Sequence, residues 1–284
     1  MEIMIDGVNT YYEMYGEGLP IVMLHGWGVD HNILKGCMEP LFDKKNQFKR
    51  LYIDLPGMGK TGLNEKIQTS DDVRNYLEKV INSLIPNEKY ALVGKSYGGY
   101  LARGIVKNNT DRVIGMLQIC PVAFFSTHLQ NAPKRVVRER ESSIKQIVPI
   151  EEWEYFDLFH VRQTKEVWEK YEEFILPGTK IANYDFLENV LSKGKEFSIN
   201  VDTNNSYTFP TLFLCGRQDW CVGYSDLFTL LEQYERASFV VIDNAGHNLE
   251  YEQIEMFNTS VLSWINNVLS YTENNRTTSS TSYD

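Results

Sequence analysis

The chain has 284 residues, 43% of them hydrophobic and 23% charged, with a formal net charge of −10 and a pI near 5.1. These values are typical of one soluble domain with room for an insertion, and the acidic balance argues against a nucleic-acid partner, since phosphate backbones bind basic surfaces. No apolar run approaches the roughly 18 residues of a membrane span, and the start lacks the features of a secretory signal, so we expect a cytoplasmic protein.

Strand and helix patterns alternate along the first half of the chain. A hairpin is predicted at Ile3–Ile5 and Thr10–Tyr15, around the turn pair Asp6-Gly7. Helical spacing follows at Ser70–Leu84 and Tyr97–Lys107. Short continuous apolar runs indicate strands covered on both faces, at Pro20–Leu24, Leu51–Ile53, Tyr90–Val93, Val113–Ile119, Thr211–Leu214 and Phe239–Ile242. This order predicts a mostly parallel sheet with helices on both faces.

The alternation stops between Phe124 and Tyr207. This stretch is rich in aromatic residues and shows helical patterns at Lys134–Ile147, Thr164–Leu176 and Tyr184–Leu191, without a convincing buried strand. We therefore expect a helical insertion that lies over the sheet. Residues 272–284 are polar without an apolar period, which predicts a disordered tail.

The G-K-S sequence at residues 94–96 has two interpretations, a phosphate-binding loop or a nucleophile elbow. The phosphate loop requires a glycine five positions earlier, where Lys89 stands here, and a second G-K-T at 59–61 has Asp54 in the same place. The elbow requires G-x-S-x-G between a buried strand and a helix, and Gly98 completes that pattern. The elbow is therefore favoured, with Ser96 as a nucleophile.

A serine nucleophile needs a base, and the base needs an orienting acid. His247 follows an apolar strand in a loop, which is where open α/β sheets place their sites, whereas His128 and His160 lie at or within the insertion. Asp219 follows the strand before that of His247 and is the predicted acid. The competing carboxylates are Asp226, which is expected on the next helix, and Asp243, which ends the strand of His247 itself.

Acyl-transfer chemistry also requires backbone N–H groups that bind a developing oxyanion. One is expected from Tyr97, the residue after the nucleophile, and a second from Trp27 in a glycine-rich loop after an early strand. The neighbours Gly26 and Gly28 let this loop turn, and the ring of His25 is expected to hold it in shape.

Five motifs together resemble the α/β-hydrolase superfamily, in the branch with a helical cap: HGWG at 25–28, DLPGMG at 54–59, GKSYGG at 94–99, GRQD at 216–219 and DNAGH at 243–247. The resemblance implies a mostly parallel eight-stranded sheet flanked by helices, with a cap inserted after the sixth strand. The expected core is 1–123 and 206–271, and the expected cap is 124–205.

The expected activity is hydrolysis of a small acyl compound, a carboxylic ester first, through an acyl-enzyme on Ser96. The alternatives are C–C bond hydrolysis, lyase or iminopeptidase chemistry on the same three residues, and a ligand-binding protein without activity. Relatives that open epoxides or remove halides use an aspartate nucleophile, and C–C hydrolases often carry an aromatic residue where Asn248 stands here. No metal or organic cofactor is expected. The four cysteines show no zinc or disulfide spacing and are expected to be free thiols.

Overall fold

The computed structural model describes residues 1–42, 47–202 and 206–280, and in the last helix it describes side chains up to residue 275. A central sheet of eight strands has the order β1-β2-β4-β3-β5-β6-β9-β10, in which β1 and β2 are antiparallel to their neighbours and the other pairs are parallel. The strands are β1 (Glu2–Ile5), β2 (Val8–Tyr15), β3 (Leu19–Leu24), β4 (Phe48–Ile53), β5 (Tyr90–Lys95), β6 (Val113–Ile119), β9 (Thr211–Gly216) and β10 (Ala237–Ile242). The predicted fold class is confirmed.

The sequence pattern explains where these strands lie. Every residue of β5, β6 and β9 is buried, as their continuous apolar runs predicted for central parallel strands. The predicted hairpin of β1 and β2 turns at Asp6 and Gly7, whose φ values of 49° and 82° fit a two-residue turn. Each predicted strand is therefore present, and the central ones run side by side.

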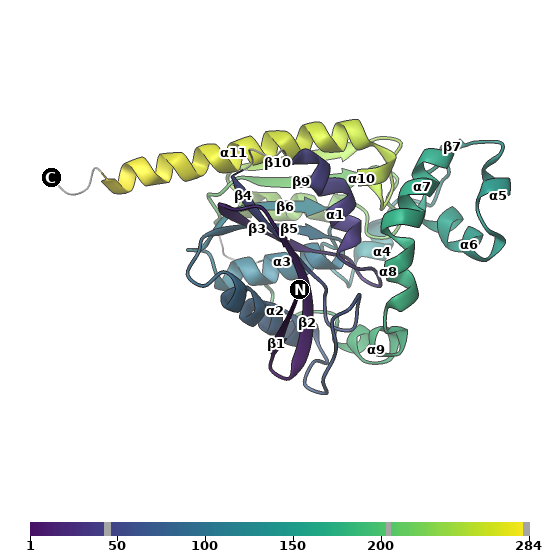
Figure 1. Cartoon of the computed structure of the whole chain (residues 1–284). Coiled ribbons are helices and arrows are strands. Elements are labelled where there is room, and N and C mark those ends of the chain that lie inside the picture. Colours follow the sequence, from purple (N-terminus) through teal and green to yellow (C-terminus); the bar gives the residue numbers. More distant parts are fainter. Residues whose placement is uncertain (43–46, 203–205, 281–284) are drawn as a thin grey trace.

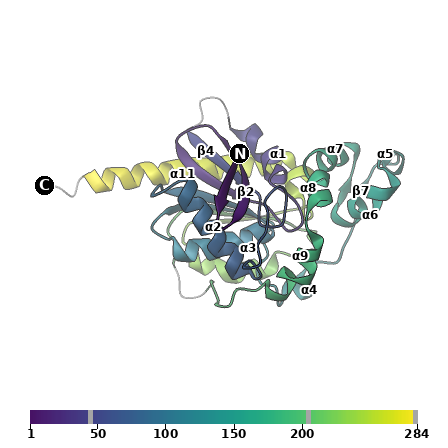
Figure 2. The same cartoon turned by 60° about the horizontal axis from the view of Figure 1, so that its bottom comes forward.

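Helices cover both faces of the sheet (Figures 1 and 2). One face carries α2 and α3, and the other carries α1 and α11, which packs on β6 and β9. Helix α2 begins with a capping box, in which the Thr69 side chain and the Asp72 carboxylate satisfy each other's backbone N–H groups. The bounds are α1 (Asn32–Met38), η1 (Glu39–Leu41), α2 (Ser70–Leu84), α3 (Tyr97–Asn108), η3 (Ser225–Gln233), α10 (Leu249–Glu252) and α11 (Ile254–Ser280).

The insertion lies between β6 and β9, as predicted, and forms the cap beside the sheet in Figure 1. It contains α4 (His128–Asn131), β7 (Glu139–Arg140), α5 (Ile144–Ile147), α6 (Ile150–Phe159), β8 (Arg162–Gln163), α7 (Lys165–Phe174), α8 (Leu176–Ile181), α9 (Tyr184–Asn189) and η2 (Leu191–Gly194). The exact domain limits of 124 and 205 stay predictions.

One helix predicted in the cap is wrong. Residues 134–147 hold only the short α5, because the backbone before it pairs with another segment. The N–H groups of Arg138 and Glu141 donate to the carbonyls of Val161 and Gln163, and β7 lies parallel to β8. Tertiary pairing has outweighed the local helical pattern here.

Helix α11 extends past the edge of the sheet toward the C-terminus (Figures 1 and 2). The sequence predicts a disordered tail at 272–284, but residues 272–280 continue this helix, and 281–284 lie outside the described residues. Within the described part of the chain, no helix combines the length and apolarity that crossing a membrane requires.

Candidate active site

Ser96 lies at a sharp turn between β5 and α3. Its φ of 54° and ψ of −117° are unfavourable for a residue with a side chain, which costs about 1–3 kcal/mol. A Cβ atom at Gly98 would lie 2.1 Å from the Leu24 carbonyl oxygen, and one at Gly94 would lie 2.6 Å from the Gly98 carbonyl oxygen. The glycines on either side of Ser96 therefore allow the strand and the helix to meet closely enough to form the turn.

Three side chains that are distant in the sequence form one hydrogen-bond chain. Ser96 Oγ lies 3.0 Å from His247 Nε2, and His247 Nδ1 lies 2.9 Å from Asp219 Oδ2. The carboxylate can only accept, so Nδ1 carries the proton and Nε2 is left to accept from the serine hydroxyl. This arrangement lets His247 remove a proton from Ser96 while Asp219 keeps the ring oriented.

Backbone structure positions the acid and the ring. Asp219 follows β9 and is fully buried, and its Oδ1 accepts hydrogen bonds from the N–H groups of Cys221 and Val222 at 2.9 and 3.2 Å. His247 follows β10 in the loop before α10. Because β5, β9 and β10 are parallel, their carboxyl ends bring Ser96, Asp219 and His247 to the same edge of the sheet.

Two backbone N–H groups beside Ser96 are available to a ligand. Those of Trp27 and Tyr97 make no hydrogen bond to the part of the chain that the structure describes. The loop that carries Trp27 passes close to the nucleophile, since a Cβ at Gly26 would lie 3.2 Å from Ser96 Cβ. These groups can stabilise negative charge on an oxygen bound next to Ser96.

Both ring nitrogen atoms of His25 make hydrogen bonds to the backbone. Nδ1 lies 2.8 Å from the carbonyl oxygen of Gly26, and Nε2 accepts from the N–H of Leu55 at 2.9 Å. Burial lowers the pKa of His25, so the ring is neutral and can both donate and accept. At Gly28, a φ of 70° turns the chain out of the loop. His25 therefore connects the Trp27 loop to the segment after β4.

The DLPGMG segment after β4 is a structural turn. Asp54 accepts hydrogen bonds from the N–H groups of His31 and Lys60 at 2.9 Å each, and its Oδ1 lies 2.8 Å from His31 Nδ1. A Cβ at Gly59 would lie 2.3 Å from this carboxylate. The glycine therefore makes room for Asp54, which accounts for the G-K-T sequence without a phosphate ligand.

The other histidine and carboxylates that the sequence offered as candidates make hydrogen bonds outside this site. His128 Nδ1 lies 2.9 Å from the carbonyl oxygen of Phe125, while Asp226 and Asp243 accept hydrogen bonds from side chains other than histidine. Cys120 brings its sulfur near Asp219 and His247, within the 4.8 Å spread of a possible metal site. Burial raises the pKa of the Cys120 thiol well above its usual value, and Asp219 and His247 already bind each other.

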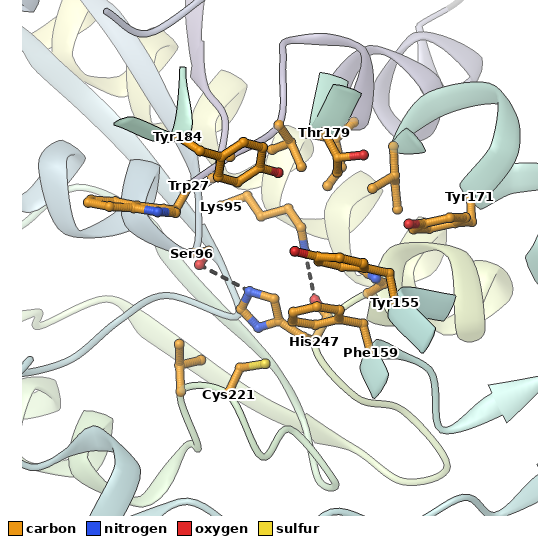
Figure 3. A pocket seen from close by; sticks show the side chains of 17 residues that line it. Trp27, Lys95, Ser96, Tyr155, Phe159, Tyr171, Thr179, Tyr184, Cys221 and His247 are labelled. Atoms are coloured by element: carbon orange, nitrogen blue, oxygen red, sulfur yellow. Dashed lines mark hydrogen bonds between the residues drawn. The ribbon is translucent and has the colours of Figure 1, made fainter. Parts of the chain in front are cut away.

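A cavity of about 320 Å³ lies between Ser96 and the cap, and Figure 3 shows Ser96 and His247 facing it. Its lining is mostly apolar, with Val29 and Ile33 from the core and Phe159 and Ile175 from the cap. This volume is at the small end of the range for ligand pockets. The cavity can therefore enclose a small molecule beside the serine hydroxyl.

Comparisons with known proteins decide the family. The model of the Hydrolase_4 family, described as serine aminopeptidase, S33, matches residues 20–254, which is most of the chain. This chain belongs to that family of α/β-hydrolases. A crystal structure of an α/β superfamily hydrolase from Oenococcus oeni PSU-1 superposes on the hydrolase with a TM-score of 0.84 and 28% identity, over 94% of this chain and 99% of that one.

More distant relatives of the hydrolase include named esterases. A pimeloyl-[acyl-carrier protein] methyl ester esterase from Legionella pneumophila (strain Paris) is 23% identical over 89% of this chain and 97% of its own length. The structure of a thermophilic esterase from Thermogutta terrifontis shares the fold, with a TM-score of 0.66 and 23% identity over 94% of this chain and 99% of that one.

Lys95 stands between two motif residues, and the sequence alone predicts no role for it. Its side chain is almost fully buried, and its Nζ donates to the backbone carbonyl of His247 at 2.6 Å (Figure 3) and lies 2.8 Å from Glu250 Oε1. Burial disfavours the ammonium, but attraction to Glu250 outweighs it and raises the pKa of Lys95. The Lys95 ammonium thus connects the end of β5 to the loop of His247 and to α10.

Glu252 connects the same loop to the cap. One oxygen of this buried carboxylate accepts from the N–H of Gly246 at 2.5 Å, and the other accepts from the N–H groups of Val161 and Arg162 at 2.5 and 3.0 Å. Burial raises the pKa of Glu252 to about 7, although these three hydrogen bonds favour the charged form. No local sequence pattern indicates this role of Glu252, because its partners Val161 and Arg162 lie about 90 positions away in the chain.

Proposed function

We propose that this hydrolase cleaves small carboxylic esters through an acyl-enzyme on Ser96. The observation that carries the proposal is the hydrogen-bond chain from Ser96 through His247 to Asp219, which opens onto a small cavity next to two available N–H groups. Serine, imidazole and carboxylate in this order are the parts that acyl transfer needs.

In the first half of the reaction, Ser96 Oγ attacks the ester carbonyl carbon as His247 Nε2 takes the hydroxyl proton. The carbonyl oxygen becomes an oxyanion and accepts hydrogen bonds from the N–H groups of Trp27 and Tyr97, each worth about 3 kcal/mol in the transition state. The bond from carbon to the alcohol oxygen then breaks, and His247 gives its proton to the leaving alcohol. Asp219 stabilises the imidazolium during this step.

In the second half, water takes the place of the alcohol. His247 Nε2 accepts a proton from the water while the water oxygen attacks the acyl carbon. The N–H groups of Trp27 and Tyr97 bind the new oxyanion. The bond from carbon to Ser96 Oγ breaks, and the proton returns from His247 to the serine. The carboxylic acid leaves, and the proposed cycle needs no metal or organic cofactor.

The cavity favours an ester over an amino-terminal peptide. A pocket for a peptide's ammonium group needs a negative partner, and no Asp or Glu is found among the described residues that line this cavity. Asn248, which follows His247, donates its side-chain amide to His160 Nε2 at 3.2 Å and presents no aromatic surface to the site. The relative from Legionella pneumophila carries an esterase name, which supports the same substrate class.

The test uses p-nitrophenyl butanoate and a fluorophosphonate probe. The wild-type chain should hydrolyse the ester and become labelled, and Ser96→Ala should lose both properties while unfolding at the same temperature as wild type. Cys120→Ser serves as a matched control beside the site and should still be labelled. A Ser96→Ala protein that keeps its esterase activity would contradict the proposal, and a folded wild type that is never labelled would favour a ligand-binding role.

A further inference from the structure

The cap places an unpaired phenol in the cavity. Tyr171 of α7 is only 2% exposed and lines the cavity, yet its hydroxyl has no hydrogen-bond partner among the residues that the structure describes. Figure 3 shows this hydroxyl pointing into the space between the cap and Ser96. The residue as a whole is buried, but its hydroxyl oxygen borders the cavity, where it is free to donate to a molecule bound there.

The ring of Tyr171 cannot turn away to find a partner elsewhere. Its centroid lies 5.8 Å from that of Phe156, 5.6 Å from that of Trp168 and 5.2 Å from that of His160. His160 offers no free nitrogen, because Nδ1 lies 2.9 Å from the Phe156 carbonyl oxygen and Nε2 accepts from Asn248. Packing thus holds the hydroxyl at the cavity wall.

Two further tyrosines of the cap direct hydroxyl groups to the same space. Figure 3 shows the hydroxyls of Tyr155 and Tyr184 pointing inward, and neither has a hydrogen-bond partner in the described part of the chain. The phenol of Tyr184 lies over the loop of Trp27, since its hydroxyl oxygen is 3.6 Å from where a Cβ of Gly28 would lie. The cavity is thus apolar in its walls but carries several phenol groups on the side of the cap.

The charge of the site indicates which group these phenols bind. Lys95 is the only lysine or arginine among the described cavity-lining residues, and its ammonium is already paired with Glu250. An anionic group would therefore lose its hydration without gaining a free cation, which is costly. Burial raises the pKa of both Tyr171 and Tyr184, so these phenols stay neutral near pH 7 and can donate a hydrogen bond.

We propose that the substrate carries an uncharged oxygen acceptor, such as a keto or ether oxygen, that receives a hydrogen bond from Tyr171. This inference rests on the proposed esterase function and narrows its substrate class. Ser96 and His247 cleave the ester, and the acceptor binds on the side of the cavity that the cap forms. An ester with a plain alkyl chain fits the same cavity but leaves the phenol unpaired.

The test is a paired panel of p-nitrophenyl esters. Acyl chains with a keto group three, four or five carbons from the ester carbonyl are each compared with the alkyl chain of equal length and with a chain that ends in a carboxylate. For the keto chain whose oxygen reaches Tyr171, wild-type kcat/KM should exceed that of its alkyl partner by about 3- to 10-fold, as expected for one neutral hydrogen bond. The carboxylate chains should be the poorest substrates.

Variants separate recognition from folding. In Tyr171→Phe, which removes only the oxygen atom, the ratio of kcat/KM for the keto ester over the alkyl ester should fall to about one. Tyr76→Phe is the matched control, because Tyr76 is a buried tyrosine of α2 outside the cavity, and it should keep the preference.

The outcomes distinguish this inference from the proposed function. Equal rates on keto and alkyl esters in both wild type and Tyr171→Phe would overturn the inference and leave the esterase proposal standing. A preference for the carboxylate chain would overturn the uncharged acceptor. Failure of the wild type to hydrolyse any member of the panel would count against the esterase function itself.

Discussion

The sheet and the cap contribute to the site in different ways. The sheet supplies Ser96, Asp219 and His247 from the ends of parallel strands, where backbone geometry and buried hydrogen bonds determine their positions. The cap supplies side chains that line the cavity, among them Phe159 and Tyr171. The proposed reaction therefore depends on the sheet and the choice of substrate on the cap. Substitutions in the two regions should consequently change different kinetic parameters.

The largest effect is expected at the acid of the hydrogen-bond chain. Asp219→Asn should lower kcat for p-nitrophenyl butanoate by about 10⁴-fold, because an amide nitrogen in place of Oδ2 would favour the wrong tautomer of His247. The side-chain oxygen can still accept from Cys221 and Val222, so the unfolding temperature should change little. Steady-state kinetics and thermal unfolding of the same preparation measure both effects. A loss below tenfold would remove Asp219 from its proposed role.

The next effect concerns Lys95, a positioning residue between the sheet and the His247 loop. Lys95→Met should lower kcat by about 10- to 100-fold through misplacement of His247, and unfolding free energy by about 3–5 kcal/mol, since Glu250 is left buried and unpaired. KM for an alkyl ester should stay within about twofold. Stopped-flow acylation and urea unfolding measure these quantities.

The double variant Lys95→Met/Glu250→Met separates the two roles of the pair. It replaces the buried charges by apolar side chains and should recover most of the stability. It cannot restore the hydrogen bond to the His247 carbonyl, so kcat should stay low. If kcat recovers together with stability, Lys95 contributes to folding alone.

A smaller effect is expected from Glu252, which connects the loop of His247 to the cap. Because its pKa of about 7 lies above the ordinary value of 4.5, the folded state holds an extra proton between these pH values. Unfolding free energy should therefore fall by about 3 kcal/mol as pH rises from about 4.5 to about 7, and no further above that.

Glu252→Gln provides the reference for this titration. Urea unfolding of wild type and variant across the pH range cancels the contributions of other groups, including His160, whose pKa burial lowers to about 4. The difference between the two proteins should follow the titration of Glu252. A difference that does not change with pH would show that this carboxyl has the same pKa in the folded and unfolded states.

The smallest effect is expected within the cap. The ring of Phe159 lies beside those of Tyr155 and Trp220, with centroids 6.2 and 5.9 Å away, and lines the cavity. Phe159→Ala should enlarge the cavity and raise the ratio of kcat/KM for octanoate over butanoate esters by about 5-fold. The rate of fluorophosphonate labelling should not change. Slower labelling would mean that this part of the cap also orients the nucleophile.

The sequence predicted the sheet better than the cap for a physical reason. A parallel strand buried on both faces must be apolar along its whole length, so β5 and β6 could be recognised from their residues alone. In the cap, the segment at 134–147 has a helical pattern, but its backbone pairs with Val161 and Gln163. Such pairing depends on which distant segment lies alongside the backbone. The local periodicity of hydrophobic residues carries no information about that segment.

By itself, the sequence predicted the nature and order of the residues that are proposed to react. Serine in a G-x-S-x-G turn, an aspartate after one strand and a histidine after the next are local signals, because each depends on a strand and the turn that follows it. The choice of Asp219 over Asp226 and Asp243 could be made from these positions. The structure then brought Ser96, His247 and Asp219 into hydrogen-bond contact.

Only the tertiary structure decided what surrounds these groups. Lys95 pairs with Glu250 across 155 positions of sequence, and Tyr171 reaches the cavity from a helix whose own pattern predicts only an amphipathic surface. Burial brings a lysine between two motif residues into contact with the loop of His247, and it leaves the hydroxyl of a helical tyrosine without a partner among the described residues. Both properties arise from desolvation and from the residues placed opposite, and neither of these is a property of the local sequence.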